Sequence, residues 1–255
     1  VLLLDDGRIS LRIDAVQGAK IHCVVLIGGV LSSQKGINVQ GGGLAAPALT
    51  AKDRADIMTA VRLGADYVAI SFVKDANDVY SARALITQAG GHAKVVAKIE
   101  RAEAISQLAA IIEASDAIMV ARGDLGVEVG DAQVPGLQKQ MIRMARAQNK
   151  AVITATQMME SMITQSMPTR AEVSDVANAV LDGTDAVMLS AETAVGQFPI
   201  ETIQAVVRVC IAAEQTEQST PLQSLQINPI GYTDEAIAKA AIYIANVYAV
   251  KAIVT

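Results

Sequence analysis

Five short, mostly apolar segments recur in the middle of this chain, and each is followed by a stretch with helical periodicity. The expected strands are Tyr67–Phe72, Val95–Glu100, Ala117–Ala121, Ala151–Thr156 and Ala186–Ser190. The expected helices are Ala76–Ala89, Ala102–Glu113, Pro135–Gln148, Arg170–Leu181 and Pro199–Glu214. Strands that alternate with helices in this way form a parallel sheet through right-handed crossovers. The pattern therefore predicts an α/β fold, and a closed barrel and an open sheet both satisfy it.

The N-terminal region has a different character, because its pattern is typical of an all-β segment. Polar and apolar residues alternate in Arg8–Asp14, as in a half-buried antiparallel strand. A second strand is expected at Lys20–Ile27, and the glycine run at 41–43 marks a hinge to the rest of the chain. Residues 1–43 are therefore predicted to be part of a small β-rich domain.

Local signals also mark the starts of helices and the end of the central region. Thr50–Asp53 resembles a capping box, and Thr169–Glu172 is a second one. The polar stretch Gln215–Gln226 is expected to be a linker before a helix over Asp234–Tyr248. Lys251–Thr255 is expected to be a strand that begins a further domain. The predicted domains are residues 1–43, 44–217 and 218–255.

The composition limits the partners that the chain can take. It has 255 residues, 52% of them apolar, and a formal net charge of -5 at pH 7. The lack of a basic block argues against a nucleic-acid surface, and no apolar run is long enough to span a membrane. Cys23 and Cys210 have no metal-ligand spacing, which favours a reducing, cytoplasmic compartment. Because the chain starts at Val1 as if within a strand, we expect an internal cut there, not a signal peptide.

The segment Val95–Glu100 ends with two opposite charges on one face. Lys98 and Glu100 are two residues apart, so on a strand their side chains point to the same side. Burying such charges is unfavourable, and ligands of α/β folds bind at the C-terminal ends of the strands. Two interpretations stay open: Glu100 holds a metal while Lys98 faces an anion, or the two form a structural ion pair at the rim of the core.

Polar residues follow the other expected strands as well. Asp124 comes just after the third strand, and with Glu100 it offers the carboxylate oxygens that Mg²⁺ and Mn²⁺ prefer; the alternative is that both residues are helix caps. Gly123 and Asp124 have backbone N–H groups suited to a carboxylate or phosphate. Thr156 and Ser190 supply hydroxyls that could bind an anion or pass a proton, although each alone is more often an ordinary strand-end residue.

Five motifs, in this order along the chain, resemble the pyruvate kinase family in its bacterial form. They are Ala97-Lys98-Ile99-Glu100-Arg101, Met119-Val120-Ala121-Arg122-Gly123-Asp124-Leu125-Gly126, Ala155-Thr156-Gln157-Met158-Met159-Glu160-Ser161-Met162, Pro168-Thr169-Arg170-Ala171-Glu172 and Met188-Leu189-Ser190-Ala191-Glu192-Thr193. The resemblance covers essentially the whole chain. It implies a partial TIM (β/α)₈ barrel of about five βα units, preceded by part of a β-rich lid domain and followed by the start of an α/β C-terminal domain.

The resemblance also implies the transfer of a phosphoryl group from phosphoenolpyruvate to ADP, giving pyruvate and ATP. The catalytic residues that it implies are Lys98, Thr156 and Ser190. The substrate-binding residues that it implies are Lys98, Gly123, Asp124, Thr156, Phe72 and Arg122. By the same resemblance, Glu100 and Asp124 hold Mg²⁺ or Mn²⁺, and Lys35 in the lid reaches a nucleotide phosphate.

Compared with the family, this chain is expected to be an internal fragment. It lacks the N-terminal barrel strands, which carry the family's arginine, asparagine and serine motif for phosphate and K⁺, and most of the C-terminal domain. A five-strand arc leaves two unpaired edges and an exposed apolar face, so the chain alone is expected to be inactive or poorly soluble. The parent is expected to be a homotetramer that uses K⁺ through ligands outside this chain. Two other interpretations are a Mg²⁺-dependent aldolase or mutase with a phosphoenolpyruvate/pyruvate barrel, and a non-catalytic fragment.

Overall fold

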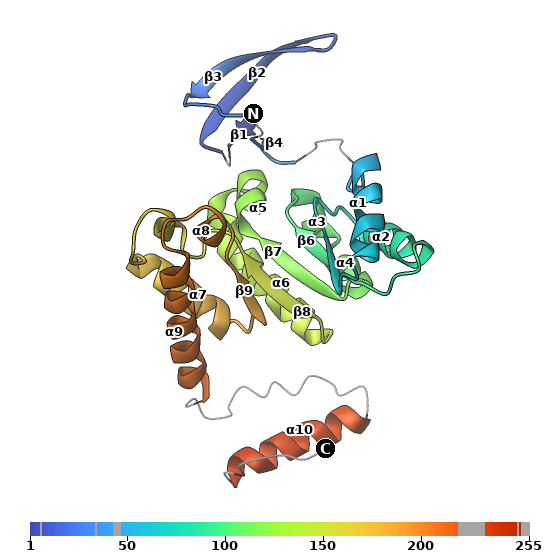
Figure 1. Ribbon diagram of the computed structural model, residues 1–255, viewed down its shortest axis with the longest axis vertical. Coiled ribbons are helices and arrows are strands. Elements are labelled where there is room, and N and C mark those ends of the chain that lie inside the picture. Colours follow the sequence, from blue (N-terminus) through green and yellow to red (C-terminus); the bar gives the residue numbers. More distant parts are fainter. Residues whose placement is uncertain (6, 34, 43–46, 219–232, 249, 251–255) are drawn as a thin grey trace. The chain divides into compact units, whose positions relative to one another are not determined.

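The computed structural model of the chain describes residues 1–5, 7–33, 35–42, 47–218, 233–248 and 250. The chain divides into two compact units, Val1–Ala213 and Glu214–Thr255. The larger unit contains an antiparallel sheet of four strands and a parallel sheet of five (Figure 1).

The antiparallel sheet is built from the N-terminal residues, in the strand order β3-β2-β1-β4. Its strands are β1 (Leu2–Leu4), β2 (Ile9–Gln17), β3 (Lys20–Ile27) and β4 (Ile37–Val39). In the β2–β3 hairpin Gln17 pairs with Lys20, and Gly18 takes the positive φ of 60° that a two-residue turn requires. The prediction of a β-rich N-terminal part is confirmed, although the first long strand continues to Gln17 and does not stop at Asp14.

The parallel sheet contains the five predicted strands, and their spatial order β5-β6-β7-β8-β9 follows the chain. They are β5 (Tyr67–Ile70), β6 (Lys94–Ile99), β7 (Ala117–Ala121), β8 (Ala151–Ala155) and β9 (Ala186–Met188). An open doubly wound sheet reverses its strand order at a switch point, whereas a barrel wall does not. The sheet is therefore an arc of a barrel, which resolves the two possibilities that the periodicity left open.

The helices of the larger unit connect these strands. They are α1 (Ala51–Arg62), α2 (Ala76–Gln88), α3 (Ala102–Ser106), α4 (Leu108–Ala114), α5 (Arg122–Val129), α6 (Val134–Ala147), α7 (Arg170–Leu181), α8 (Ala191–Ala194) and α9 (Pro199–Gln218). Two short 3₁₀ helices are η1 (Asp131–Gln133) and η2 (Glu160–Ile163). Both predicted capping boxes are confirmed, at Thr50 with Asp53 and at Thr169 with Glu172.

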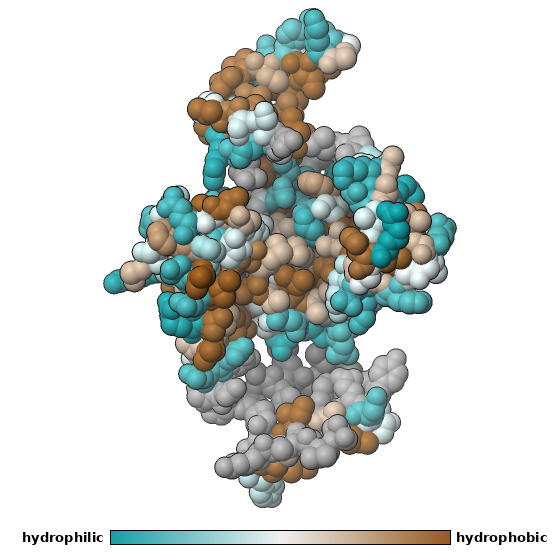
Figure 2. Space-filling view, viewed as in Figure 1, coloured by the Kyte–Doolittle hydropathy of each residue, from teal (hydrophilic) through white to brown (hydrophobic). Residues whose placement is uncertain are grey.

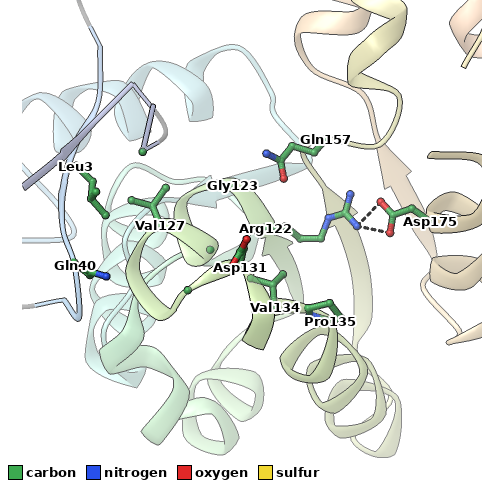
Figure 3. Close-up of a pocket in the computed structure, with 13 residues that line it drawn as sticks. Leu3, Gln40, Arg122, Gly123, Val127, Asp131, Val134, Pro135, Gln157 and Asp175 are labelled. Carbon is green, nitrogen blue, oxygen red and sulfur yellow. Dashed lines mark hydrogen bonds and ion pairs between the residues drawn. The ribbon is translucent and has the colours of Figure 1, made fainter. Parts of the chain in front are cut away.

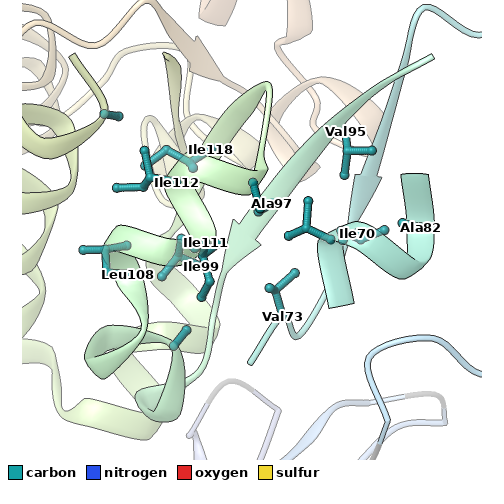
Figure 4. Packing of buried hydrophobic residues seen from close by; sticks show 14 of the residues in the cluster. Ile70, Val73, Ala82, Val95, Ala97, Ile99, Leu108, Ile111, Ile112 and Ile118 are labelled. Carbon is teal, nitrogen blue, oxygen red and sulfur yellow. The ribbon is translucent and has the colours of Figure 1, made fainter. Parts of the chain in front are cut away.

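Alternation of side chains along β6 separates two apolar clusters. The β6 residues that enter the main core against the helices are Val95, Ala97 and Ile99 (Figure 4). Val96 points to the opposite face, where it belongs to a smaller cluster with Met119. Because side chains alternate with a period of two, Lys98 and Glu100 point to the same face as Val96. We refer to this side of the arc, opposite the main core, as the concave face.

Three details of the prediction are wrong. The helix expected over Ala102–Glu113 is interrupted at Gln107, whose ψ of 9° lies outside the α-helical region, so two helices form. Helix α5 begins directly after β7, where the sequence predicts none, because the two glycines within it disfavour a helix. The expected linker from Gln215 is helical as far as Gln218, where α9 ends.

Exposed apolar surface accompanies the open edges of the arc. Four apolar residues spaced three or four apart on α9 are exposed, Ile200 (65%), Ile203 (50%), Val207 (48%) and Ile211 (49%). Figure 2 shows the apolar surface along this helix. At the ends of the five-strand order, β5 and β9 each pair with one neighbour only among the described residues. This matches the expectation of unpaired edges and exposed apolar surface.

Besides the last residues of α9, the described part of the smaller unit contains helix α10 (Thr233–Val247), at the position where a helix is predicted. The strand predicted at Lys251–Thr255 lies outside the described residues. Within the part of the chain that the structure describes, no helix combines the length and apolar character needed to cross a membrane.

Candidate active site at the C-terminal ends of the strands

Lys98 and Glu100 form an ion pair where β6 ends. Lys98 Nζ lies 2.6 Å from Glu100 Oε1 and donates a hydrogen bond to Ser71 Oγ at 3.0 Å. The Glu100 side chain is 1% exposed, whereas that of Lys98 is 25% exposed. The ion pair of one interpretation is therefore present, and it lies at the edge of the sheet where the other interpretation places a ligand. The more exposed partner is the cation, so an entering anion meets the ammonium first.

The backbone that follows β5 holds the second oxygen of Glu100. The N–H of Phe72 donates to Glu100 Oε2 at 2.7 Å. Phe72 has a φ of 55°, which is uncommon for a bulky residue and is often found at functional sites. Phe72 is 39% exposed, and its contact with substrate remains a prediction. Both oxygens of Glu100 thus have a partner, which fixes the carboxylate in orientation.

Helix α5 places Gly123 and Asp124 in its first turn, directly after β7. The first N–H groups of a helix lack partners within the helix, and its N-terminus favours negative charge. The Gly123 N–H donates to Thr156 Oγ1 at 2.8 Å, which links the ends of β7 and β8. Since β6 and β7 are paired in parallel, Glu100 and Asp124 follow the ends of adjacent strands.

The donor set of Glu100 and Asp124 fits a hard divalent cation. Both residues offer carboxylate oxygens, and Mg²⁺ is usually bound by one or two carboxylates together with oxygens of substrate and water. Among the described residues, no third histidine, cysteine or acidic side chain completes a cluster with them. An ion held here would therefore need further ligands from substrate, water or backbone oxygens.

Thr156 lies one residue beyond β8 in a left-handed backbone conformation. Its φ is 68°, and that of Gln157 is 55°. Left-handed geometry costs an L-residue about 1–2 kcal/mol, and for a β-branched residue it is a genuine outlier. Thr156 Oγ1 accepts the Gly123 N–H, and among the described residues the Thr156 hydroxyl donates no hydrogen bond of its own. The hydroxyl is thus oriented by one bond, and its own O–H can donate to a further group.

Arg122 precedes these groups, but its side chain is bonded inside the protein. It is 8% exposed, and Nη1 donates to both oxygens of Asp175 on α7, each at 2.7 Å (Figure 3). Its Nη2 and Nε donate to the carbonyl oxygen of Thr156 at 2.6 and 3.2 Å. These bonds do not support the predicted contact of Arg122 with substrate, because they engage its donors with other protein groups.

Ser190 lies just past β9, at the start of α8. Its N–H donates to Glu192 Oε2 at 2.8 Å, and Glu192 Oε1 accepts the N–H of Met159 at 3.3 Å. Glu192 is 3% exposed, so this buried carboxylate ties the segment after β8 to the segment after β9. Neither Glu192 nor Asp175 was predicted from the sequence; a signal for Glu192 was its position two residues after Ser190 in the same motif.

Glu172, in the first turn of α7, binds Ser161 in the segment that starts at Thr156. Glu172 accepts bonds from the N–H and the hydroxyl of Ser161, at 2.7 and 2.6 Å, in addition to its capping-box bonds with Thr169. Burial acts to raise the pKa of Glu172, but the hydrogen bonds from Ser161 and Thr169 outweigh it and lower this pKa below its ordinary value of 4.5.

We expect Glu172→Gln to lower the free energy of unfolding by about 1–2 kcal/mol at pH 7, because the bonds to a charged acceptor are weakened. A carboxyl with a lowered pKa in the folded state stabilises the fold above pH 4.5, and this stabilisation is lost as the pH falls through the lowered pKa. Urea unfolding of both forms at several pH values checks this, with exposed Glu201→Gln in the first turn of α9 as the control. A difference between wild type and Glu172→Gln that does not shrink in acid would contradict it.

Lys35 lies on the β-rich part and is paired within it. Its Nζ is 2.7 Å from Asp5 Oδ1, and this hydrogen bond lowers the pKa of the Asp5 carboxyl. The structure therefore joins Lys35 to Asp5, whereas Lys98 pairs with Glu100. The nucleotide contact of Lys35 remains a prediction.

A cavity of about 500 Å³ lies beside α5 (Figure 3). Its lining includes Gly123, Arg122 and Gln157 from the ends of β7 and β8, and Gln40 from the β-rich part. Lys98 and Glu100 are not part of its lining. The candidate site is therefore defined by side chains at the strand ends and not by this cavity.

Comparison with known proteins agrees with the motifs. The family profile described as "Pyruvate kinase, barrel domain" matches residues 1–203. "Pyruvate kinase II" of Salmonella typhimurium is 58% identical over 249 residues, 96% of this chain and 52% of its own length. "Pyruvate kinase" of Haemophilus influenzae is 56% identical over 100% of this chain and 54% of its own length, and that of Mycobacterium tuberculosis is 49% identical over 86% and 47%. The chain spans about half the length of the curated relatives it matches.

Proposed function

Because this chain belongs to the pyruvate kinase family, we propose that the protein containing it transfers the phosphoryl group of phosphoenolpyruvate to ADP and yields pyruvate and ATP. The observation that carries the proposal is the set of groups at adjacent strand ends: the Lys98–Glu100 pair, Asp124, and Thr156 bonded to Gly123. Phosphoryl transfer depends on positioning and charge stabilisation, with little covalent help from the protein. A cation, two carboxylates and a fixed hydroxyl are suited to that task.

Lys98 stabilises the negative charge of the phosphoryl group during its transfer. Its ammonium is partly exposed and already lies beside Ser71 and Glu100, so a small movement toward an anion keeps it near both. Glu100 and Asp124 would hold Mg²⁺ or Mn²⁺, which neutralises phosphate charge when bound. K⁺ is included in the proposal, with ligands outside this chain.

Departure of the phosphoryl group leaves the enolate of pyruvate, which takes a proton on its methylene carbon. The Thr156 hydroxyl retains its proton, and the exposed Ser190 follows the neighbouring strand. One of these hydroxyls delivers the proton, either directly or through water. The N-terminal turn of α5, with Gly123, orients the substrate carboxylate.

The remaining contacts belong to the same proposal. Lys35 binds a phosphate of ADP after leaving Asp5, and the Phe72 ring packs beside Lys98. The free thiols of Cys23 and Cys210 suit a cytoplasmic location. We also propose that the full-length protein is a homotetramer.

The test is pyruvate formation by the full-length protein that contains this chain, followed through lactate dehydrogenase and NADH. We expect the rate to require phosphoenolpyruvate, ADP and Mg²⁺ together. Pyruvate formation that does not depend on ADP would overturn the proposal and would instead favour an aldolase or mutase.

The isolated chain of 255 residues is expected to show no turnover in this assay. The described arc pairs β5 and β9 on one side only, so the concave face with Lys98 is open to water, which weakens electrostatic stabilisation. The measurement compares the isolated chain with the full-length protein at equal molar concentration, with circular dichroism to check that the chain is folded. Turnover of the folded chain at a comparable rate would refute this expectation.

A further inference from the structure

The left-handed backbone at Thr156 and Gln157 needs a partner that holds it. Their φ angles are 68° and 55°, which threonine and glutamine rarely adopt without support from surrounding groups. Neither lies within a helix or strand, so no ladder of backbone hydrogen bonds enforces this turn. The carbonyl of Thr156, which joins the two residues, is the group whose orientation defines it.

Arg122 holds that carbonyl with two nitrogens. Nη2 and Nε approach the Thr156 oxygen at 2.6 and 3.2 Å, and Nε is also 3.3 Å from the carbonyl oxygen of Ala155. The opposite side of the guanidinium is fixed by both oxygens of Asp175 at 2.7 Å. Because the planar guanidinium is hydrogen-bonded on both sides, it couples the position of α7 to that of the backbone after β8.

Two neighbouring residues, Arg122 and Gly123, each hold a different group of Thr156. The side chain of Arg122 fixes its carbonyl, and the N–H of Gly123 fixes its hydroxyl at 2.8 Å. We propose that Arg122, oriented by Asp175, is a positioning residue that keeps the Thr156 hydroxyl in its reactive place. The role of the Thr156 hydroxyl in this assignment rests on the proposed function. The hydrogen bonds that hold Thr156 do not depend on that function.

A second arginine–aspartate pair in this chain provides a matched comparison. Arg83 Nη2 donates to the carbonyl oxygen of Ala114 and to Asp116, both at 2.9 Å. Asp116 in turn accepts the N–H of Val95, near the N-terminal end of β6 and away from the candidate site. The chemistry of the two pairs is alike, but only the Arg122 pair reaches a left-handed residue of the candidate site.

The test uses Arg122→Lys in the full-length protein, because lysine keeps the charge and cannot make the forked bonds. We expect kcat to fall about 100-fold, since a small displacement of a reacting group has an effect of that size. In a Thr156→Ala background the same change is expected to lower kcat less than about 3-fold, because the group being positioned is already gone. Arg83→Lys is expected to leave kcat unchanged in both backgrounds.

A readout without substrate separates this inference from the proposed function. Amide hydrogen exchange of peptides covering 156–161 is expected to rise in Arg122→Lys and to stay unchanged in Arg83→Lys. An equal loss of kcat with and without Thr156, or unchanged exchange at 156–161, would overturn the positioning role. If the wild-type protein does not transfer phosphate to ADP, the proposed function fails, and the exchange measurement still decides whether Arg122 holds the turn.

Discussion

Replacing Lys98 with methionine in the full-length protein is expected to lower the rate of phosphoryl transfer about 1,000-fold while the fold persists. The side chain keeps its length but loses the ammonium that lies 2.6 Å from Glu100 on a side chain that is 25% exposed. Removing one preorganised group that stabilises developing charge typically lowers kcat by about 10²–10³-fold. Single-turnover formation of ATP from bound phosphoenolpyruvate and ADP measures the transfer step directly.

The matched control for Lys98 is Lys94→Met at the other end of the same strand. Lys94 is exposed, and its ammonium lies 5.8 Å from the centroid of the Tyr67 ring. The change is chemically identical, so it separates loss of a charge on β6 from loss of the charge at the site. Thermal unfolding is compared with Mg²⁺ present, since Glu100 keeps its bond from the Phe72 N–H when Lys98 is gone. A Lys98→Met enzyme within about 10-fold of wild type would refute the assigned role.

Glu100→Gln is expected to weaken Mn²⁺ binding by at least about 100-fold, with a parallel loss of activity at fixed metal concentration. Glutamine keeps the shape of the side chain and still accepts the Phe72 N–H, but it removes one of two carboxylates offered to the ion. Asp124→Asn is expected to act in the same way. The signal of free Mn²⁺ in electron paramagnetic resonance gives the affinity without relying on turnover.

Asp131→Asn serves as the control for the metal experiment. Asp131 is an exposed carboxylate in η1, just past the helix that carries Asp124, and its Oδ1 accepts the neighbouring Ala132 N–H. If Asp131→Asn lowers Mn²⁺ affinity as much as Glu100→Gln does, the loss of affinity reflects overall negative charge and not ligation. An unchanged affinity in both Glu100→Gln and Asp124→Asn would remove the metal site from the proposal.

Elements that depend on neighbours in sequence were predictable, and those that depend on distant packing were not. The Thr169–Glu172 capping box was foreseen because its bonds span three residues. The interruption at Gln107 and the helix that starts at Arg122 were not, since each runs against local preference. Helical propensity is a weak bias that tertiary contacts override, and these two positions show it.

The sequence by itself determined which groups end the strands and which of them share a face. The two-residue spacing of Lys98 and Glu100 places both on one side of β6, and the motifs identify the family. Only the tertiary structure decided what holds Thr156 in place. Arg122 and Asp175 are 53 residues apart, and only the tertiary fold brings Asp175 on α7 to the arginine that follows β7. The left-handed turn that they stabilise is locally unfavourable, so no local pattern could predict it.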